Sequence, residues 1–354
     1  WSNTFYKGTY DDYSYSVIED NNNDIVITGK ASNVHQYAES DMGEDSKLLM
    51  IKTDSDGNVY GCSDTTAFNY NPYANAGECD YSINVPEDFE TIQEGIDAAV
   101  DGDTVFVAAG TYYENNITIN GYPDGSNARN IVVLGEGPDS TIINGQDSAS
   151  VLIFTDWVKE ETVFSGFTIE NGHSDNGAGI YIKQSSDPLL SNLIIRDNVS
   201  EYDGMSDLGY GGGMQINNSN PTLQNILIYN NTAYDGGGIY MYNADPILLN
   251  VTITRNRAES SGSAIYFSGS GNNATLTNCI IYDSYYFNGS ENVLDNSNNI
   301  VPEWWNVGNN QILYSNLPLA DDPDEGVSNI SAQPNFTDPE NGDFTLMKDS
   351  PCIY

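Results

Sequence analysis

A short glycine-rich motif recurs four times in the middle of the chain. Each copy begins with three small residues and continues with an apolar residue, Tyr or Gln, and a second apolar residue. The copies begin at Gly177, Gly211, Gly236 and Gly262, so their first positions differ by 34, 25 and 26 residues. Repeats of this length, built from short strands without helices, are typical of a parallel β-solenoid, because one coil cannot bury its inner face without neighbours. The longer step of 34 indicates a projecting loop at residues 202–209.

An Asn-containing element keeps step with the glycine motif. Each Asn precedes an apolar run and lies five positions after an Asp or another Asn. A side-chain amide can donate to one copy of itself and accept from the next, so we predict an inward-facing ladder at a coil corner. Glycine at such corners permits positive φ angles. The predicted ladder consists of Asn192, Asn225, Asn250 and Asn278.

The two elements together resemble the repeats of the chlamydial polymorphic outer-membrane adhesins. Those repeats pair a small-residue motif with an apolar-x-x-Asn motif, which appears here at residues 194–198 and 228–231. This chain has Ile or Leu where the adhesins have Phe. The resemblance therefore concerns the style of the repeat and not the function of one family.

The repeats are preceded by the segment INVPEDFETIQEGIDAAVDGDTVFVAAGTYYENNITI, residues 83–119. Its apolar residues Phe89, Ile92, Ile96 and Ala99 recur at helical spacing, which predicts a helix. Such a helix would cover the exposed edge at the open end of a strand stack. The segment resembles the opening cap of pectate-lyase-like proteins, which implies an all-β, right-handed parallel β-helix over residues 83–300 with an N-terminal capping helix.

The flanks of the solenoid have other patterns. Strand-like runs at 15–18, 24–29 and 47–52 predict a small antiparallel β unit in residues 1–60, which resembles one blade of a bacterial secreted β-propeller repeat. Residues 61–82 form a Cys-bounded loop module, and residues 301–354 are expected to cap the last coil. The chain begins with Trp1, which fits a processed product or a piece of a longer protein.

The charge of the chain restricts its partners. It has 51 Asp and Glu residues against 11 Lys and Arg, a net charge of -40. Such a surface repels phosphate backbones, which excludes nucleic-acid binding, and it attracts divalent cations. No apolar run is long enough to span a membrane. The resemblance of residues 1–60 to secreted proteins implies an extracellular or cell-surface location. The candidate calcium ligands are Asp54, Asp56, Asp64, Asn69, Asn71 and Asp80.

The residues that could carry a function lie on the repeats. Tyr181, Tyr240 and Tyr266 share one repeat position, where they would either stack on sugar rings or pack against each other across coils. No basic residue of the repeats stands beside an in-register Asp cluster, so we assign no catalytic residue. We predict a secreted structural or adhesive protein that self-associates into a fibre or array or binds surface glycans. The alternatives are a carbohydrate-active enzyme (a polysaccharide lyase or glycoside hydrolase) and a non-catalytic glycan-binding protein.

The chain also contains Asn-x-Ser/Thr sequences, which accept N-linked glycans in hosts that glycosylate. We expect Asn250 to be inaccessible because of its predicted inward direction, and exposed corner sites such as Asn198 and Asn230 to be accessible. Apart from Asn250, the candidate sites are Asn116, Asn198, Asn217, Asn230, Asn273, Asn288, Asn329 and Asn335.

We predict a disulfide between Cys62 and Cys79, because these residues bracket a short polar segment in a chain expected to be extracellular. Closing this loop should contribute roughly 3 kcal/mol to stability in the chain-entropy model. Mass mapping of peptides under non-reducing conditions should recover the linked pair. Recovery of both residues as free thiols would refute the prediction. The pairing of Cys279 and Cys352 stays open.

Overall fold

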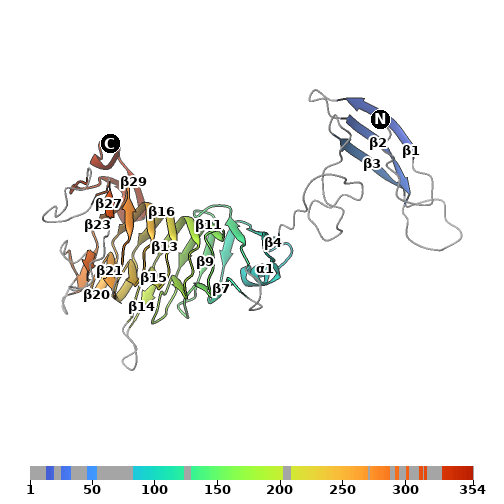
Figure 1. The fold of residues 1–354 in the computed structure, drawn as a ribbon. Coiled ribbons are helices and arrows are strands. Elements are labelled where there is room, and N and C mark those ends of the chain that lie inside the picture. Colours follow the sequence, from blue (N-terminus) through green and yellow to red (C-terminus); the bar gives the residue numbers. More distant parts are fainter. Residues whose placement is uncertain are drawn as a thin grey trace. The chain divides into compact units, whose positions relative to one another are not determined.

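A computed structural model describes residues 83–122, 129–201, 209–269, 272–287, 292–294, 300–302, 311–313, 315–316 and 329–353, and three strands nearer the N-terminus. The chain divides into two compact units, Trp1–Ser82 and Ile83–Tyr354. Figure 1 labels the elements of both units.

The first unit contains a three-stranded antiparallel sheet in the order β1-β2-β3. Its strands are β1 (Tyr13–Glu19), β2 (Ile25–Ser32) and β3 (Ser46–Thr53). This confirms the three predicted strand runs, each of which is longer than predicted. The candidate calcium ligands and the predicted disulfide lie outside the described residues.

The second unit is a stack of parallel strands (Figure 1). One face is a seven-stranded sheet in which the copies of the glycine motif are neighbours: Ile180 pairs with Met214, Met214 with Ile239, and Ile239 with Ile265. This register confirms the predicted solenoid. The strands are β7 (Ile117–Asn120), β10 (Leu152–Thr155), β12 (Ile180–Lys183), β15 (Met214–Asn217), β18 (Ile239–Tyr242), β21 (Ile265–Ser268) and β26 (Ile300–Pro302).

Two more parallel sheets close the coils, and a C-terminal hairpin follows them. The twelve-stranded sheet contains β4 (Ile83–Val85), β5 (Thr104–Val107), β6 (Gly110–Tyr112), β8 (Val132–Gly135), β9 (Thr141–Asn144), β11 (Val163–Glu170), β13 (Leu189–Arg196), β16 (Thr222–Tyr229), β19 (Ile247–Thr254), β22 (Thr275–Thr277), β23 (Ile280–Tyr282) and β27 (Gln311–Leu313). The five-stranded sheet contains β14 (Val199–Ser200), β17 (Thr232–Asp235), β20 (Arg257–Ser261), β24 (Tyr285–Phe287) and the antiparallel β25 (Asn292–Leu294). The hairpin consists of β28 (Phe336–Asp338), the 3-10 turn η2 (Pro339–Asn341) and β29 (Asp343–Leu346), before η3 (Pro351–Ile353).

The interior of the coils is filled with apolar side chains from successive strands. In β12, for example, Ile180 and Ile182 are fully buried, whereas Tyr181 between them faces outward. Phe164 and Phe167 of β11 stack with their ring centroids 4.4 Å apart. Apolar burial of this kind is the main favourable term in folding, and it explains why the inner positions are nearly all Ile, Leu, Val, Met or Phe.

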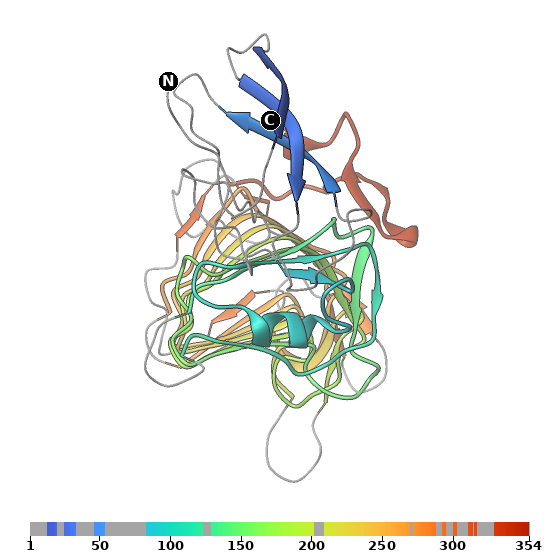
Figure 2. The same cartoon turned by 90° about the vertical axis from the view of Figure 1, so that its right-hand side faces the viewer.

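The predicted capping helix is present as α1 (Ile92–Ala98), and Figure 2 shows it lying across the end of the coils. A capping box between Thr91 and Glu94 begins the helix, and Ile92 and Ile96 are fully buried. The side chain of Gln93 accepts a hydrogen bond from the backbone N–H of Thr118 (2.6 Å) and donates one to its carbonyl oxygen (3.3 Å). This amide therefore satisfies backbone groups of the edge strand β7 that a further strand would otherwise pair.

The predicted Asn ladder exists, but the prediction that its side chains face inward was wrong. Each Nδ2 donates to the preceding Oδ1, over 3.3 Å from Asn225 to Asn192, 2.9 Å from Asn250 to Asn225 and 2.6 Å from Asn278 to Asn250. All four side chains are exposed. Each residue has a left-handed backbone (φ 51° to 55°), which interrupts the alternation that would have turned the side chain inward. Asn192, Asn225 and Asn250 lie at the bends of long strands, and Asn278 lies between β22 and β23.

A second ladder is buried and was not predicted. It consists of Asn198, Asn231 and Asn256, whose side chains are fully buried. The Nδ2 of Asn198 donates to Oδ1 of Asn231 (2.9 Å), and the Nδ2 of Asn231 donates to Oδ1 of Asn256 (3.0 Å). Backbone groups provide further hydrogen-bond partners for these amides. The N–H of Asn198, for example, also donates to Oδ1 of Asn231 (3.1 Å).

These positions correct two expectations about glycosylation. Asn198 cannot accept a glycan in the folded chain because its amide is buried in the second ladder. Asn250, which we expected to be inaccessible, is exposed. Of the other candidate sites, Asn116, Asn230 and Asn273 are exposed, Asn217, Asn329 and Asn335 are partly exposed, and Asn288 lies outside the described residues.

The two ladders should differ in their contribution to stability. Replacing Asn231 with Leu leaves buried hydrogen-bonding groups of Asn198 and Asn256 without partners, which should cost about 3 kcal/mol or more. Replacing Asn225 with Gly keeps a residue suited to a left-handed backbone, and water can replace the hydrogen bonds that the exposed amide made. The free energy of unfolding should therefore fall by less than about 1 kcal/mol. Urea unfolding of both variants measures the difference. Equal losses would show that the exposed ladder also supports the fold.

Candidate functional site

The outer face of the seven-stranded sheet brings the predicted tyrosines into one row. Tyr181 pairs in register with Gln215, Gln215 with Tyr240, and Tyr240 with Tyr266. A neighbouring outward row contains Lys183, Asn217, Tyr242 and Ser268. Adjacent strands lie about 4.8 Å apart, so each row presents one side chain at every such step.

Tyr240 lies at the packed centre of this row. Its ring centroid is 4.5 Å from that of Tyr210 and 5.5 Å from that of Tyr266, and only 6% of its surface is exposed. The interpretation as a cross-coil packing contact is therefore correct for Tyr240, and its ring faces are not open to a sugar. Tyr181 and Tyr266 are partly exposed, so they remain candidates for stacking.

Lys183 lies beside Tyr181 on the same strand. Its Nζ is 4.9 Å from the centroid of the Tyr181 ring, a distance at which a cation is attracted to the face of an aromatic ring. This contact holds a positive charge on an outer face of a chain that is strongly acidic overall. The arginines of the repeats make different contacts, since Arg196 pairs with Glu170 (2.5 Å) and Arg257 with Glu259 (3.2 Å).

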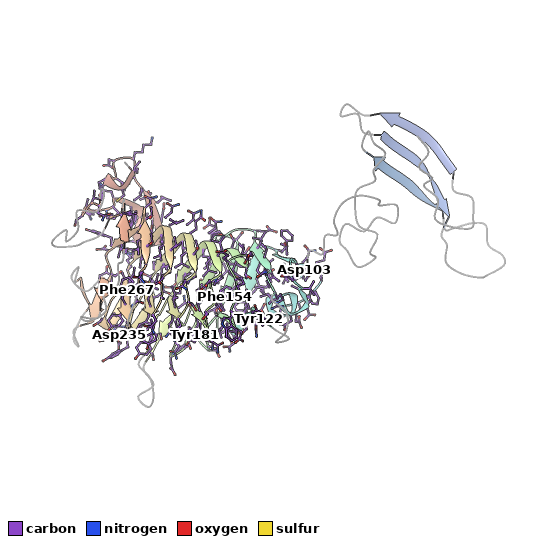
Figure 3. All side chains as sticks on the ribbon, in the orientation of Figure 1. Asp103, Tyr122, Phe154, Tyr181, Asp235 and Phe267 are labelled. Atoms are coloured by element: carbon purple, nitrogen blue, oxygen red, sulfur yellow. The ribbon has the colours of Figure 1, made fainter. Side chains whose placement is uncertain are left out.

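Two further aromatic residues extend this face at the corner that follows the sheet. Trp157, just after β10, is 54% exposed, and its ring meets that of Tyr122 edge to face with centroids 6.3 Å apart. Gly121 permits this approach, because a Cβ there would lie 2.6 Å from the carbonyl oxygen of Asp156. Figure 3 shows Tyr122 and Tyr181 along the same side of the solenoid.

Sequence reasoning missed Trp157 and Tyr122 because their coils lack the glycine motif that marks the later repeats. A usable signal was present, since each residue follows a four-residue strand at the position where the later coils turn. We name the group formed by Tyr122, Trp157, Tyr181, Lys183 and Tyr266 the aromatic face.

The outward positions of this sheet carry no carboxylate in the described strands β7 to β21. They are Thr118, Asn120, Ile153, Thr155, Tyr181, Lys183, Gln215, Asn217, Tyr240, Tyr242, Tyr266 and Ser268. Hydrolysis of a glycosidic bond usually uses two carboxylates that flank the bond. The described outward positions of this sheet therefore do not supply such a pair of carboxylates.

The remaining reactive groups do not form a site with the aromatic face. His173 lies 3.8 Å from Glu201 at an exposed position. Cys279 is buried, which raises the pKa of its thiol to about 11 and leaves it protonated at neutral pH. Both Cys279 and Cys352 are free thiols. Within the described part of the chain, no group of three or more His, Cys, Asp or Glu side chains could hold a metal ion.

No helix in the described ranges is both long and apolar enough to cross a membrane.

Comparison with known proteins identifies the class of fold. A family model described as a right-handed beta helix region matches residues 138–303. With the parallel sheets described above, this match defines the chain as a right-handed parallel β-helix protein, as the repeats predicted. None of the curated sequences compared with the chain matches it.

Several solved structures that match this chain are pectin methylesterases. One, in complex with a hexasaccharide, is 11% identical with a TM-score of 0.38, and the match covers 76% of this chain and 99% of that one. The enzyme from Erwinia chrysanthemi is 12% identical with a TM-score of 0.38, covering 75% and 98%. The enzyme from Aspergillus niger is 16% identical with a TM-score of 0.29, covering 71% and 80%. At this identity the likeness concerns the fold alone.

Proposed function

We propose that the chain is a non-catalytic glycan-binding protein of the extracellular space or cell surface, with an adhesive role. The observation that carries the proposal is the aromatic face, where Trp157, Tyr122 and Tyr181 are wholly or partly open to solvent. Aromatic rings offer large apolar surfaces with a polar edge, which suits the alternating C–H and hydroxyl surfaces of a sugar ring. Exposed aromatic groups that gather on one face commonly mark a binding surface.

The scaffold beneath the aromatic face favours binding because it holds the side chains in place before a ligand arrives. Tyr181 stands on β12 between two hydrogen-bonded strands, and Lys183 rests on its ring. The side chain of Trp157 packs against Tyr122 at a corner that a left-handed backbone (φ 60°) fixes. Side chains that are ordered in advance lose less conformational entropy on binding, so less of the contact energy is offset.

Two further parts of the proposal rest on the acidic composition and on the sheet of the first unit. We propose that the chain binds calcium in its N-terminal unit, because carboxylates at this density repel each other unless cations neutralise them. We also propose that it self-associates, because a three-stranded sheet such as β1-β2-β3 is marginally stable alone and leaves unpaired backbone groups at its edges.

Removing calcium with a chelator should lower the melting temperature, since a cation that binds only the folded state stabilises it. Light scattering in calcium should give a mass above that of the 38.6 kDa chain. An unchanged melting temperature would leave only diffuse counterions, and a monodisperse monomer would remove self-association from the proposal.

Replacing Trp157 and Tyr181 with Ala should weaken glycan binding about tenfold or more, or ~1.4 kcal/mol, because both changes remove ring surface from the aromatic face. Binding of the full chain to an array of oligosaccharides, followed by calorimetry on those retained, measures the effect. Tyr113→Ala is the matched control, since Tyr113 is 65% exposed and follows β6, outside the aromatic face. Equal binding by the double variant and the control would overturn the proposal.

A further inference from the structure

A groove on a different sheet from the aromatic face follows the exposed Asn ladder. It has a volume of about 680 Å³ and runs along the bends of the twelve-stranded sheet, in β11, β13, β16 and β19. Its floor is formed by Asn192, Asn225 and Asn250. The groove therefore crosses several coils, in the direction in which the coils stack.

The floor of the groove keeps unused hydrogen-bonding capacity. Each Asn amide has two N–H donors and an oxygen with two lone pairs, and the ladder uses one N–H and one lone pair of each central member. The other N–H and the other lone pair are available because the side chains are exposed. At the near end the Nδ2 of Asn192 donates to Oγ of Ser165 (3.2 Å), which continues the polar line into β11.

The need for a left-handed backbone does not by itself explain why Asn occupies these positions. In β11 the equivalent position is Gly166, which has φ 87° and lies between the paired residues Ser165–Ser191 and Phe167–Leu193. Glycine therefore suffices to turn the strand at this corner. The amides of the next coils add a row of donors and acceptors with a repeat of about 4.8 Å, the distance between neighbouring strands.

One wall of the groove is largely aliphatic. The first outward position after each Asn carries Ile194, Leu227 or Thr252, and all three side chains are partly exposed and line the groove. A ligand in the groove would therefore meet amides on one side and C–H groups on another. That combination fits a chain of sugar rings, whose hydroxyl groups alternate with apolar C–H surfaces.

A rigid loop closes one end of the groove. Between β8 and β9 the chain inserts residues 136–140, whereas on β11 only Gly166 and Phe167 separate the residues that pair with β8 from those that pair with β9. Thr168 Oγ1 donates to the carbonyl oxygen of Pro138 (2.6 Å), and the N–H of Gly137 donates to the carbonyl oxygen of Gly166 (3.2 Å). Glu136 and Asp139 of this loop line the groove, and their negative charges disfavour an anionic ligand.

We infer that this groove binds a neutral linear glycan that lies along the solenoid axis, at a site separate from the aromatic face. The amide row hydrogen-bonds its hydroxyl groups, the aliphatic wall contacts its ring surfaces, and the acidic end discriminates against uronic-acid polymers.

The test uses the full chain with two neutral probes, cellohexaose and mannohexaose, and hexagalacturonate as the acidic comparison. In spectra of the ¹⁵N-labelled protein, a neutral probe should shift the side-chain amide signals of Asn192, Asn225 and Asn250. The triple variant N192G/N225G/N250G keeps residues suited to the left-handed backbone, and it should bind that probe at least tenfold more weakly. Leu227→Trp should weaken binding by filling the groove while leaving the amides intact.

Matched variants separate this inference from the proposed function. The Trp157→Ala/Tyr181→Ala double variant should still show the shifts of the Asn side-chain amides, because it leaves the groove unchanged. Unfolding curves of the triple variant and of Leu227→Trp should show folded protein before binding is compared. The inference is overturned if neither neutral probe shifts these amide signals, if the folded triple variant binds as the parent does, or if hexagalacturonate binds the groove as tightly as the neutral probes.

Discussion

In-register hydrogen bonding between coils is the interaction on which the rest of this structure depends. Each strand of the solenoid pairs with the equivalent strand of the next coil, so equal positions stack above one another. The buried amides of Asn198, Asn231 and Asn256 make this register specific. A slip of one residue would separate these amides and turn the apolar inner side chains toward solvent, so both polar and apolar burial oppose it.

Because register is repeated, any outward side chain that recurs in the sequence becomes a row on the surface. The aromatic face and the amide floor of the groove arise in this way on two different sheets. In both places a departure from strict repetition gives the row its chemical character. Trp157 stands at a corner where the later coils have Ser or Ala, and the loop 136–140 appears in one of the described coils. Repetition supplies the platform, and the irregular residues supply its selectivity.

The sequence predicted the architecture well because glycine and apolar periodicity reflect the coil directly. The helix α1 followed from the spacing of Ile92 and Ile96, and four strands of the seven-stranded sheet (β12, β15, β18 and β21) followed from the glycine motif. The direction of the first Asn ladder could not be predicted, because a left-handed residue inside a strand breaks the two-residue alternation. Two Asn positions per coil recur, and only the backbone angles show that Asn198, and not Asn192, faces the core. Trp157 and Tyr122 lie in coils whose sequences differ too much to be aligned with the others.

The two Asn ladders point in opposite directions. In the buried ladder each amide donates to the following coil, whereas in the exposed ladder each amide donates to the preceding coil. A row of aligned amide dipoles leaves partial positive charge at one end and partial negative charge at the other, as in a helix. Two rows of opposite sense partly cancel that charge at each end of the stack. Because the dipoles within a row lie head to tail and attract each other, an added coil extends both rows without an electrostatic cost. The length of the solenoid, and of the surfaces it presents, is therefore open to change by duplication of a single repeat.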